Sequence, residues 1–142
     1  MIILDANVLL YAYDSGAEGH VEVRRWLAHQ FRSNEMIGLP WISLWAFLRV
    51  STNLRVHRSP LSLKEAFEAI EEILRMPRAH LIQPGPNHCE ILQRLANSAQ
   101  ANGPRMTDAV LAAIAVEQGA TLASTDRDFA RFADLDWVNP LG

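Results

Sequence analysis

Three aspartates, Asp5, Asp108 and Asp126, stand where their carboxylates could act together. Asp5 ends a short apolar run, Asp108 lies in the first turn of an expected helix, and Asp126 closely follows an expected strand. Strand ends and helix starts of this kind meet at the carboxyl edge of a parallel sheet, where α/β proteins bind ligands. Carboxylates that face one another all stay ionised only when a cation lies between them. The pattern therefore predicts a site for a hard divalent ion, Mg²⁺ or Mn²⁺.

Each of these acids also has an ordinary structural explanation. Asp108 could simply interact favourably with the dipole of its helix, and residues 126–128 could form a solvated turn. Asp5 is harder to explain in this way, because an acid that ends an apolar strand close to a core usually has a partner. Taken together, the three acids favour a metal site over three unrelated surface roles.

Short apolar runs alternate with amphipathic segments along the chain. Strands are expected at residues 2–4, 36–39, 80–82, 120–124 and 136–138. Helices are expected at residues 8–13, 17–34, 41–50, 63–76, 87–101, 108–118 and 129–132, with Asn7, Ser62 and Thr107 as N-caps of three of them. Connections of this length require parallel strands and right-handed crossovers. The fold class is therefore a three-layer α/β/α sandwich around a parallel sheet.

Composition favours a single domain over residues 1–142 in a reducing compartment. Of the 142 residues, 49% are hydrophobic and 20% are charged, which is ordinary for a globular protein. The one cysteine, Cys89, cannot form an intrachain disulfide. The apolar runs are much shorter than the ~20 residues of a membrane span, and the acid at position 5 does not suit a signal peptide. We expect a cytoplasmic protein with no membrane association.

Basic residues are unevenly distributed, although the net charge is −3. Residues 36–64 contain no carboxylate but include Arg49, Arg55 and Arg58. Arginine can bind a phosphate through two parallel hydrogen bonds, so these three residues are candidate nucleic-acid contacts. A solvated surface or a general preference for arginine is the alternative explanation.

Four motifs resemble, in order and spacing, those of PIN-domain ribonucleases, and most closely the VapC-type toxins of type II toxin–antitoxin pairs. They are Ile-Leu-Asp-Ala-Asn at 3–7, Phe-Leu-Arg-Val-Ser-Thr-Asn at 47–53, Thr-Asp-Ala at 107–109 and Ser-Thr-Asp-Arg-Asp-Phe at 124–129. The resemblance covers the whole chain. It implies a five-stranded parallel sheet, a divalent-metal site, cleavage of structured RNA, dimerisation and inhibition by a small cognate antitoxin.

Carried over by position, the resemblance also implies roles for individual residues. It implies that Asp5, Asp108 and Asp126 are catalytic metal ligands, supported by Asn7, Thr107, Ser124 and Asp128. The implied reaction is hydrolysis of a phosphodiester by metal-activated water, leaving a 5′-phosphate and a 3′-hydroxyl. The family usually places a glutamate where this chain has Ala46, and residues 36–64 contain no other acid. A second ion would therefore need oxygen ligands from the substrate.

The sequence is compatible with two other functions. A phosphoaspartate enzyme or receiver domain also carries an aspartate after its first strand, but it needs a lysine near the phosphate. The only lysine, Lys64, lies at an expected helix start, away from the strand ends. The second reading is a PIN scaffold that binds RNA or a protein partner without cutting, and Ala46 is the feature that favours it.

Overall fold

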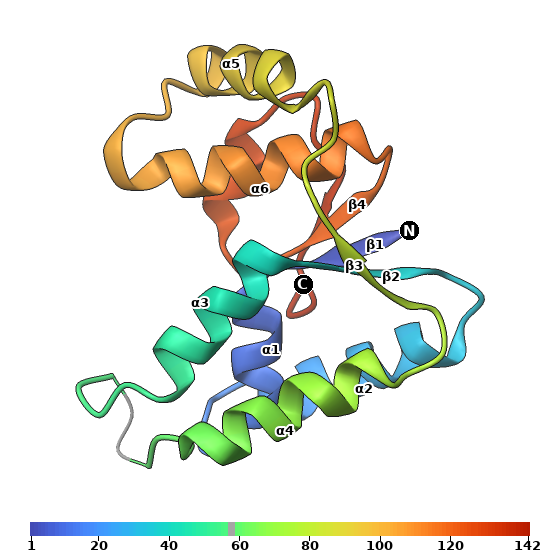
Figure 1. Cartoon of the computed structure of the whole chain (residues 1–142), viewed down its shortest axis with the longest axis vertical. Helices are drawn as coiled ribbons and strands as arrows, with labels where there is room; N and C mark the ends of the chain where they lie inside the picture. Colours follow the sequence, from blue (N-terminus) through green and yellow to red (C-terminus); the bar gives the residue numbers. More distant parts are fainter. Residues whose placement is uncertain (57–58) are drawn as a thin grey trace.

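The computed structural model describes residues 1–56 and 59–142, and a parallel sheet of five strands lies at its centre (Figure 1). The strand order is β3-β2-β1-β4-β5, and every neighbouring pair is parallel. The strands are β1 Ile2–Leu4, β2 Ile37–Pro40, β3 Ala79–Ile82, β4 Thr121–Ala123 and β5 Trp137–Val138. The predicted parallel sheet is confirmed, and each strand ends within one residue of its expected position.

Helices cover both faces of this sheet. Those on the described ranges are α1 Ala6–Tyr13, α2 His20–Arg32, α3 Trp41–Ser51, α4 Leu63–Leu74, α5 His88–Ala99, α6 Met106–Glu117 and the 3₁₀ helices η1 Gly103–Arg105 and η2 Arg127–Arg131. Figure 1 shows α2 and α4 on one face and α5 and α6 on the other, as the predicted three layers require. None of the helices in the described ranges is long and apolar enough to cross a bilayer.

The apolar run of β1 is explained by burial on both faces of the sheet. Leu4 is fully buried in a core cluster with residues of α1 to α4, whereas Ile3 is fully buried in a second cluster with residues of α5 and α6. Successive side chains of a strand point to opposite faces, so a strand covered on both sides is apolar throughout. Gly38 of β2 allows this packing, because a Cβ there would lie 2.8 Å from Cγ1 of Ile3. The two cores therefore fix β1, and with it Asp5.

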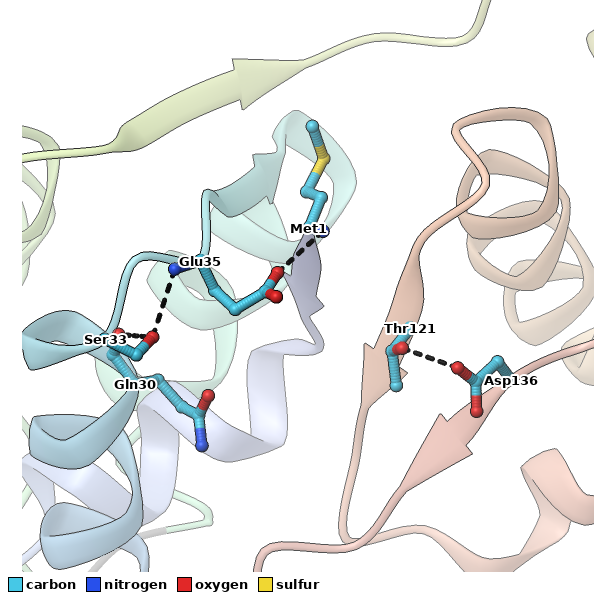
Figure 2. A network of polar contacts seen from close by, with 6 residues as sticks. All are labelled: Met1, Gln30, Ser33, Glu35, Thr121 and Asp136. Atoms are coloured by element: carbon cyan, nitrogen blue, oxygen red, sulfur yellow. Dashed lines mark hydrogen bonds and ion pairs between the residues drawn. The ribbon is translucent and has the colours of Figure 1, made fainter.

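Polar contacts join the amino ends of the strands, as Figure 2 shows. The terminal amine of Met1 donates a 2.9 Å hydrogen bond to Oε2 of Glu35, just before β2. On the other side of β1, Oγ1 of Thr121 donates a 2.6 Å hydrogen bond to Oδ2 of Asp136, just before β5. These contacts lie at the amino edge of the sheet, whereas Asp5 follows the last residue of β1 and therefore lies at the opposite, carboxyl edge.

Of the three expected N-caps, one is confirmed and two are wrong. Ser62 caps α4: its Oγ accepts a hydrogen bond from the backbone N–H of Glu65 at 3.1 Å, and the Glu65 side chain accepts one in return from the backbone N–H of Ser62. Asn7 lies inside α1, which begins at Ala6. Thr107 lies inside α6, which follows directly from η1. Asn7 is not a cap because its side chain is hydrogen-bonded to Asp5 and Ser124, and Thr107 is not a cap because α6 continues directly from η1.

The start of α2 also differs from the expectation. The sequence predicts a helix from residue 17, whereas α2 begins at His20. Gly19, at the N-cap position, has a φ of 95°, a left-handed conformation that ends the preceding turn and that glycine adopts without strain.

Candidate active site

Asp5 follows β1, and side chains from two other positions hold its carboxylate. Oδ2 of Asp5 accepts a 2.9 Å hydrogen bond from Nδ2 of Asn7 and a 2.6 Å hydrogen bond from Oγ of Ser124. Nδ2 of Asn7 also donates to Oγ of Ser124 at 3.0 Å, and Oδ1 of Asn7 accepts from the backbone N–H of Thr125 at 3.1 Å. Asp5, Asn7 and Ser124 thus form a closed triangle of hydrogen bonds that orients the carboxylate.

The sheet brings Ser124 to Asp5 because β1 and β4 are neighbours. Leu4 pairs with Ala123 in register, so the next residue of each strand leaves the sheet at the same level. The backbone N–H of Asp5 donates to the carbonyl of Ala123 at 3.0 Å. Ser124 is fully buried, and its carbonyl accepts a 3.0 Å hydrogen bond from Nε1 of Trp137 in β5. Its hydroxyl is therefore fixed beside Asp5 by backbone and side-chain contacts.

The loop after β4 continues the same network to two further acids. The backbone N–H of Asp126 donates to Oγ of Ser124 at 3.1 Å, and Oδ1 of Asp126 accepts from the backbone N–H of Asp128 at 2.9 Å. A serine hydroxyl offers one donor and two acceptor positions. Ser124 uses all three: it donates to Asp5 and accepts from Asn7 and from the amide of Asp126. This one hydroxyl joins the end of β1 to the loop after β4.

Asp108 approaches the site from the first turn of α6, where it is half-buried. Thr107 precedes it and is exposed, and its hydroxyl forms no hydrogen bond with any residue in the described ranges. Asp5, Asp108, Asp126 and Asp128 are called the acid cluster below. Of the supporting residues inferred from the sequence, Asn7 and Ser124 contact the cluster through their side chains, Asp128 does so through its backbone, and Thr107 does not.

The acids are close enough to perturb the ionisation of Asp5. Burial raises the pKa of the Asp5 carboxyl above its ordinary value of 3.8. A hydrogen bond from Ser124 and one from the backbone of Ala6 oppose this rise, while the negative charges of Asp108 and Asp126 add to it. The charged form of Asp5 is therefore destabilised in the metal-free protein, although two side chains donate hydrogen bonds to it.

Asp108 is perturbed in the same direction. Burial raises the pKa of its carboxyl, and the charges of Asp126 and Asp128 raise it further. The positive charge of Arg105 acts against them and lowers the pKa of Asp108. A cation among these acids would remove the repulsion that both raised pKa values report.

The donor chemistry of the cluster suits a hard divalent cation, because carboxylate oxygens are the ligands that Mg²⁺ and Mn²⁺ prefer. Within residues 1–56 and 59–142, however, no three aspartate, glutamate, histidine or cysteine side chains converge closely enough to form a finished metal site. The residues present fit a divalent ion by charge and by donor type, and they do not form a preassembled cage.

Two arginines stand beside Asp128 at the rim of the cluster. Nη1 of Arg105 lies 3.9 Å from Oδ2 of Asp128, and Nε of Arg131 lies 4.0 Å from Oδ1 of the same carboxylate. Both separations are too long for hydrogen bonds. Nη1 of Arg105 is shielded from solvent yet has no hydrogen-bond partner among residues 1–56 and 59–142. The sequence motifs do not single out Arg105. Its only sequence signal is that it is a basic residue three positions before Asp108.

Comparison with known proteins agrees with this arrangement. The family model described as PIN domain matches residues 2–135. The chain belongs to the PIN-domain family. It is 40% identical over 141 residues to the VapC ribonuclease Mb2897 of Mycobacterium bovis, a match that covers 99% of this chain and 96% of that protein. It is 39% identical over 140 residues to ribonuclease VapC31 of Mycobacterium tuberculosis, covering 99% of each.

Solved structures show the same PIN fold at low sequence identity. The structure of VapBC2 from Rickettsia felis, bound to a DNA fragment from its promoter, matches with a TM-score of 0.73 and 19% identity over 98% of both chains. The structure of VapC20 from Mycobacterium tuberculosis, described as a toxin that cleaves the sarcin–ricin loop, matches with a TM-score of 0.64 and 16% identity over 92% of this chain and 93% of that one. At these identities the likeness establishes the fold alone.

The candidate nucleic-acid contacts of this PIN domain lie on and after α3. Arg49 is exposed in the last turn of α3, and Arg55 is exposed in the turn that follows. Neither takes part in an ion pair between described residues. Arg58 lies outside the described residues. The structure thus leaves two of the three predicted contacts accessible to a ligand.

Ala46, where the family usually has a glutamate, is partly exposed on α3. Its neighbour Phe47 is buried in the core, whereas Trp45 is 62% exposed and stacks on Trp41 with ring centroids 6.3 Å apart. Ala46 therefore lies at the margin of the core, where a longer polar side chain would reach solvent.

Proposed function

We propose that this PIN-domain protein is a metal-dependent endoribonuclease that cleaves structured RNA by phosphodiester hydrolysis and acts as the toxin of a toxin–antitoxin pair. The observation that carries the proposal is the triangle of hydrogen bonds among Asp5, Asn7 and Ser124, with Asp108 and Asp126 near enough to raise the pKa of Asp5. The names of relatives about 40% identical over the whole chain, which describe VapC ribonucleases, support the same activity.

In this proposal Asp5, Asp108 and Asp126 hold a Mg²⁺ or Mn²⁺ ion. A divalent ion bound there would lower the pKa of a coordinated water and stabilise negative charge on the phosphate. Ser124 and Asn7 orient the carboxylate of Asp5, and the amide of Asp128 orients that of Asp126. Outer-shell partners of this kind keep ligands in position and tune their affinity for the ion. The Asp128 carboxylate supports the site from its rim, and Thr107, exposed next to Asp108, would contribute only once an ion or substrate is bound.

The RNA itself would be held by cationic side chains outside the acid cluster. Arg49 and Arg55 are exposed and without ion pairs among the described residues, and Arg58 belongs to the same acid-free stretch of sequence. One guanidinium can bind two oxygens of the same phosphate, so this surface suits an RNA backbone.

Partners and location complete the proposal. The cognate antitoxin is expected because solved structures with this fold include VapBC complexes from Rickettsia felis and Haemophilus influenzae. We also propose that residues 1–142 act as one PIN-like domain, that two copies form a homodimer, and that the protein works in the cytoplasm, where its exposed Cys89 would stay reduced. Light scattering with and without the antitoxin tests the assembly.

A second candidate function is a PIN scaffold that binds RNA or a protein partner and cuts weakly or not at all. One observation favours it: the alanine at position 46, where the family usually has a glutamate. Both candidates would bind RNA, but only the nuclease would cleave it efficiently.

Incubation of the purified protein with structured RNA, in Mg²⁺, in Mn²⁺ and in EDTA, separates these functions. The nuclease proposal predicts cleavage in either ion, none in EDTA, and products with 5′-phosphate and 3′-hydroxyl ends. RNA binding without cleavage in either ion would instead support the scaffold. Cleavage that persists in EDTA would contradict the proposed metal dependence.

A further inference from the structure

Arg105 is a cation at the rim of the acid cluster, and Nη1 of its guanidinium has no hydrogen-bond partner among the described residues. It is the last residue of η1 and directly precedes α6, which carries Asp108. Its side chain is 43% exposed, so it can be reached from solvent although one of its nitrogens is shielded. We propose that Arg105 binds a phosphate group of the RNA at the rim of the acid cluster, an inference that rests on the proposed ribonuclease function.

The hydrogen bonding of Arg105 is the first reason. A guanidinium carries five N–H donors in a planar fork, and a structural arginine normally satisfies them with close, paired bonds to a carboxylate. Here the nearest carboxylate oxygen, Oδ2 of Asp128, is 3.9 Å from Nη1, and no hydrogen bond replaces it. A shielded donor without an acceptor is unfavourable in the free protein. An acceptor that arrives with the substrate would satisfy it.

The charge around the acid cluster is the second reason. Asp5, Asp108, Asp126 and Asp128 place four carboxylates where the RNA backbone must approach, and these charges repel phosphate unless cations offset them. Arg105 is positioned to do so, because its Nη1 lies 3.9 Å from Oδ2 of Asp128 and its positive charge also acts on Asp108. A phosphate bound to Arg105 would therefore lie beside Asp128, at the rim of the acid cluster.

Asp128 does not satisfy the hydrogen-bonding capacity of Arg105, so a phosphate group can bind the guanidinium in its place. Asp128 is already shared with Arg131, whose Nε lies 4.0 Å from its other oxygen. The two arginines thus hold Asp128 loosely from two sides, and neither forms the paired contact that its fork permits. The oxygens of a phosphodiester offer that paired contact to Arg105.

Binding of a fluorescein-labelled stem–loop RNA in EDTA, measured by anisotropy over a range of KCl concentrations, tests this proposal without relying on activity. Arg105→Gln should weaken binding about tenfold and reduce the slope of log K against log salt by about 0.7–0.9, the loss of one phosphate contact. Arg105→Lys should recover the slope but only part of the affinity, since an ammonium cannot form the paired contact. Arg131→Gln is the matched control, because it removes the other arginine beside Asp128, whose exposed donors water can satisfy, unlike the shielded Nη1 of Arg105; it should leave the slope unchanged.

Removal of Arg105 should weaken RNA binding but should not weaken metal binding. Because its positive charge opposes a cation near Asp108, Arg105→Gln should bind Mn²⁺ as tightly as the wild type or more tightly, as calorimetry would show. Loss of RNA affinity with metal affinity retained would support a phosphate contact. A merely structural role would instead lower the melting temperature and weaken metal binding together, and would overturn the proposal.

Other outcomes separate this inference from the function on which it rests. If the wild type neither binds nor cleaves RNA, the ribonuclease function and this contact both fail. If the wild type binds RNA and Arg105→Gln matches it in affinity and slope, the contact alone is wrong. If Arg105→Gln loses affinity for the antitoxin and keeps its RNA affinity, the partner of Arg105 is a protein carboxylate, and the proposal is likewise overturned.

Discussion

Oγ of Ser124 donates a 2.6 Å hydrogen bond to Oδ2 of Asp5, from a residue 119 positions away in the sequence. The bond joins the residues that follow two paired strands, so the register of β1 with β4 sets its geometry. The same hydroxyl accepts hydrogen bonds from Asn7 and from the amide of Asp126. One buried serine therefore couples the positions of two proposed metal ligands, and this coupling makes it a sensitive point for mutation.

Ser124→Ala should reduce RNA cleavage about 10–100-fold, the range typical of an outer-shell partner of a metal ligand. It should also destabilise the protein by about 1–3 kcal/mol, because the half-buried carboxylate of Asp5 and the amide of Asp126 each lose a partner. Ser98→Ala, on the exposed surface of α5, is the matched control and should change neither quantity. Full activity in Ser124→Ala would contradict the role assigned to this hydroxyl.

The raised pKa of Asp5 predicts how stability depends on pH in the metal-free protein. The pKa of Asp5 in the folded state lies above the ordinary value of 3.8. At pH values between 3.8 and the folded pKa, the folded state therefore binds more protons than the unfolded state. Stability therefore increases as pH falls through the folded pKa, and the cost of the charged carboxylate is fully present above it. The stability of Asp5→Asn relative to wild type should accordingly be highest above the folded pKa and decrease toward acid. Urea unfolding in EDTA at several pH values measures this difference; a difference independent of pH would show that Asp5 is not perturbed.

Neutralising Arg55 and Arg58 together should weaken RNA binding and flatten its salt dependence. Each lost phosphate contact reduces the slope of log K against log salt by about 0.7–0.9. Arg32→Gln, exposed at the end of α2, provides a control that removes an arginine from another surface. An unchanged slope in the double variant would mean that the acid-free stretch is a solvated surface or binds another partner.

Ala46→Glu should tighten the binding of Mg²⁺ or Mn²⁺ and leave the melting temperature close to that of the wild type. Three acids can hold one ion, while a second ion would lack protein oxygens at this position. Because Ala46 is partly exposed, a glutamate there can remain hydrated and avoids the cost of a buried, unpaired charge. Calorimetric titration and thermal melts of both proteins check this. A variant that melts much lower without gaining metal, or a wild type with two sites of similar affinity, would contradict it.

The fold was predictable because its signals are local. The apolar run that ends at Asp5, the alternation of strands with helices and the capping box at Ser62 are each contained in a few residues, and the structure confirms them. Asn7 shows where local reasoning stops. As a residue type it suits an N-cap, but its side chain contacts Ser124, 117 positions away, and Asp5 instead.

The sequence indicates which acids can meet at the sheet edge, but it does not indicate how their side chains are arranged there. Topology places Asp5 and Asp126 at one edge of the sheet, so their proximity follows from strand order. The direction of each carboxylate depends on contacts such as the Ser124 triangle, which no spacing rule encodes. Thr107 is exposed and its hydroxyl makes no hydrogen bond among the described residues, whereas Arg105, at the end of η1, acts on Asp108 through its charge. Such side-chain positions become visible only in the folded chain.

Single-turnover cleavage of a structured RNA in saturating Mg²⁺ tests the central claim most directly, with Asp5→Asn, Asp108→Asn and Asp126→Asn compared with wild type. Each variant should lose more than about 100-fold in rate, beyond what an outer-shell partner contributes, and should melt at or above the wild-type temperature in EDTA because it relieves repulsion in the acid cluster. Asp128→Asn should be milder, and Glu22→Gln, an exposed acid on α2, should match the wild type. Wild-type cleavage by Asp5→Asn would contradict the assignment of this site.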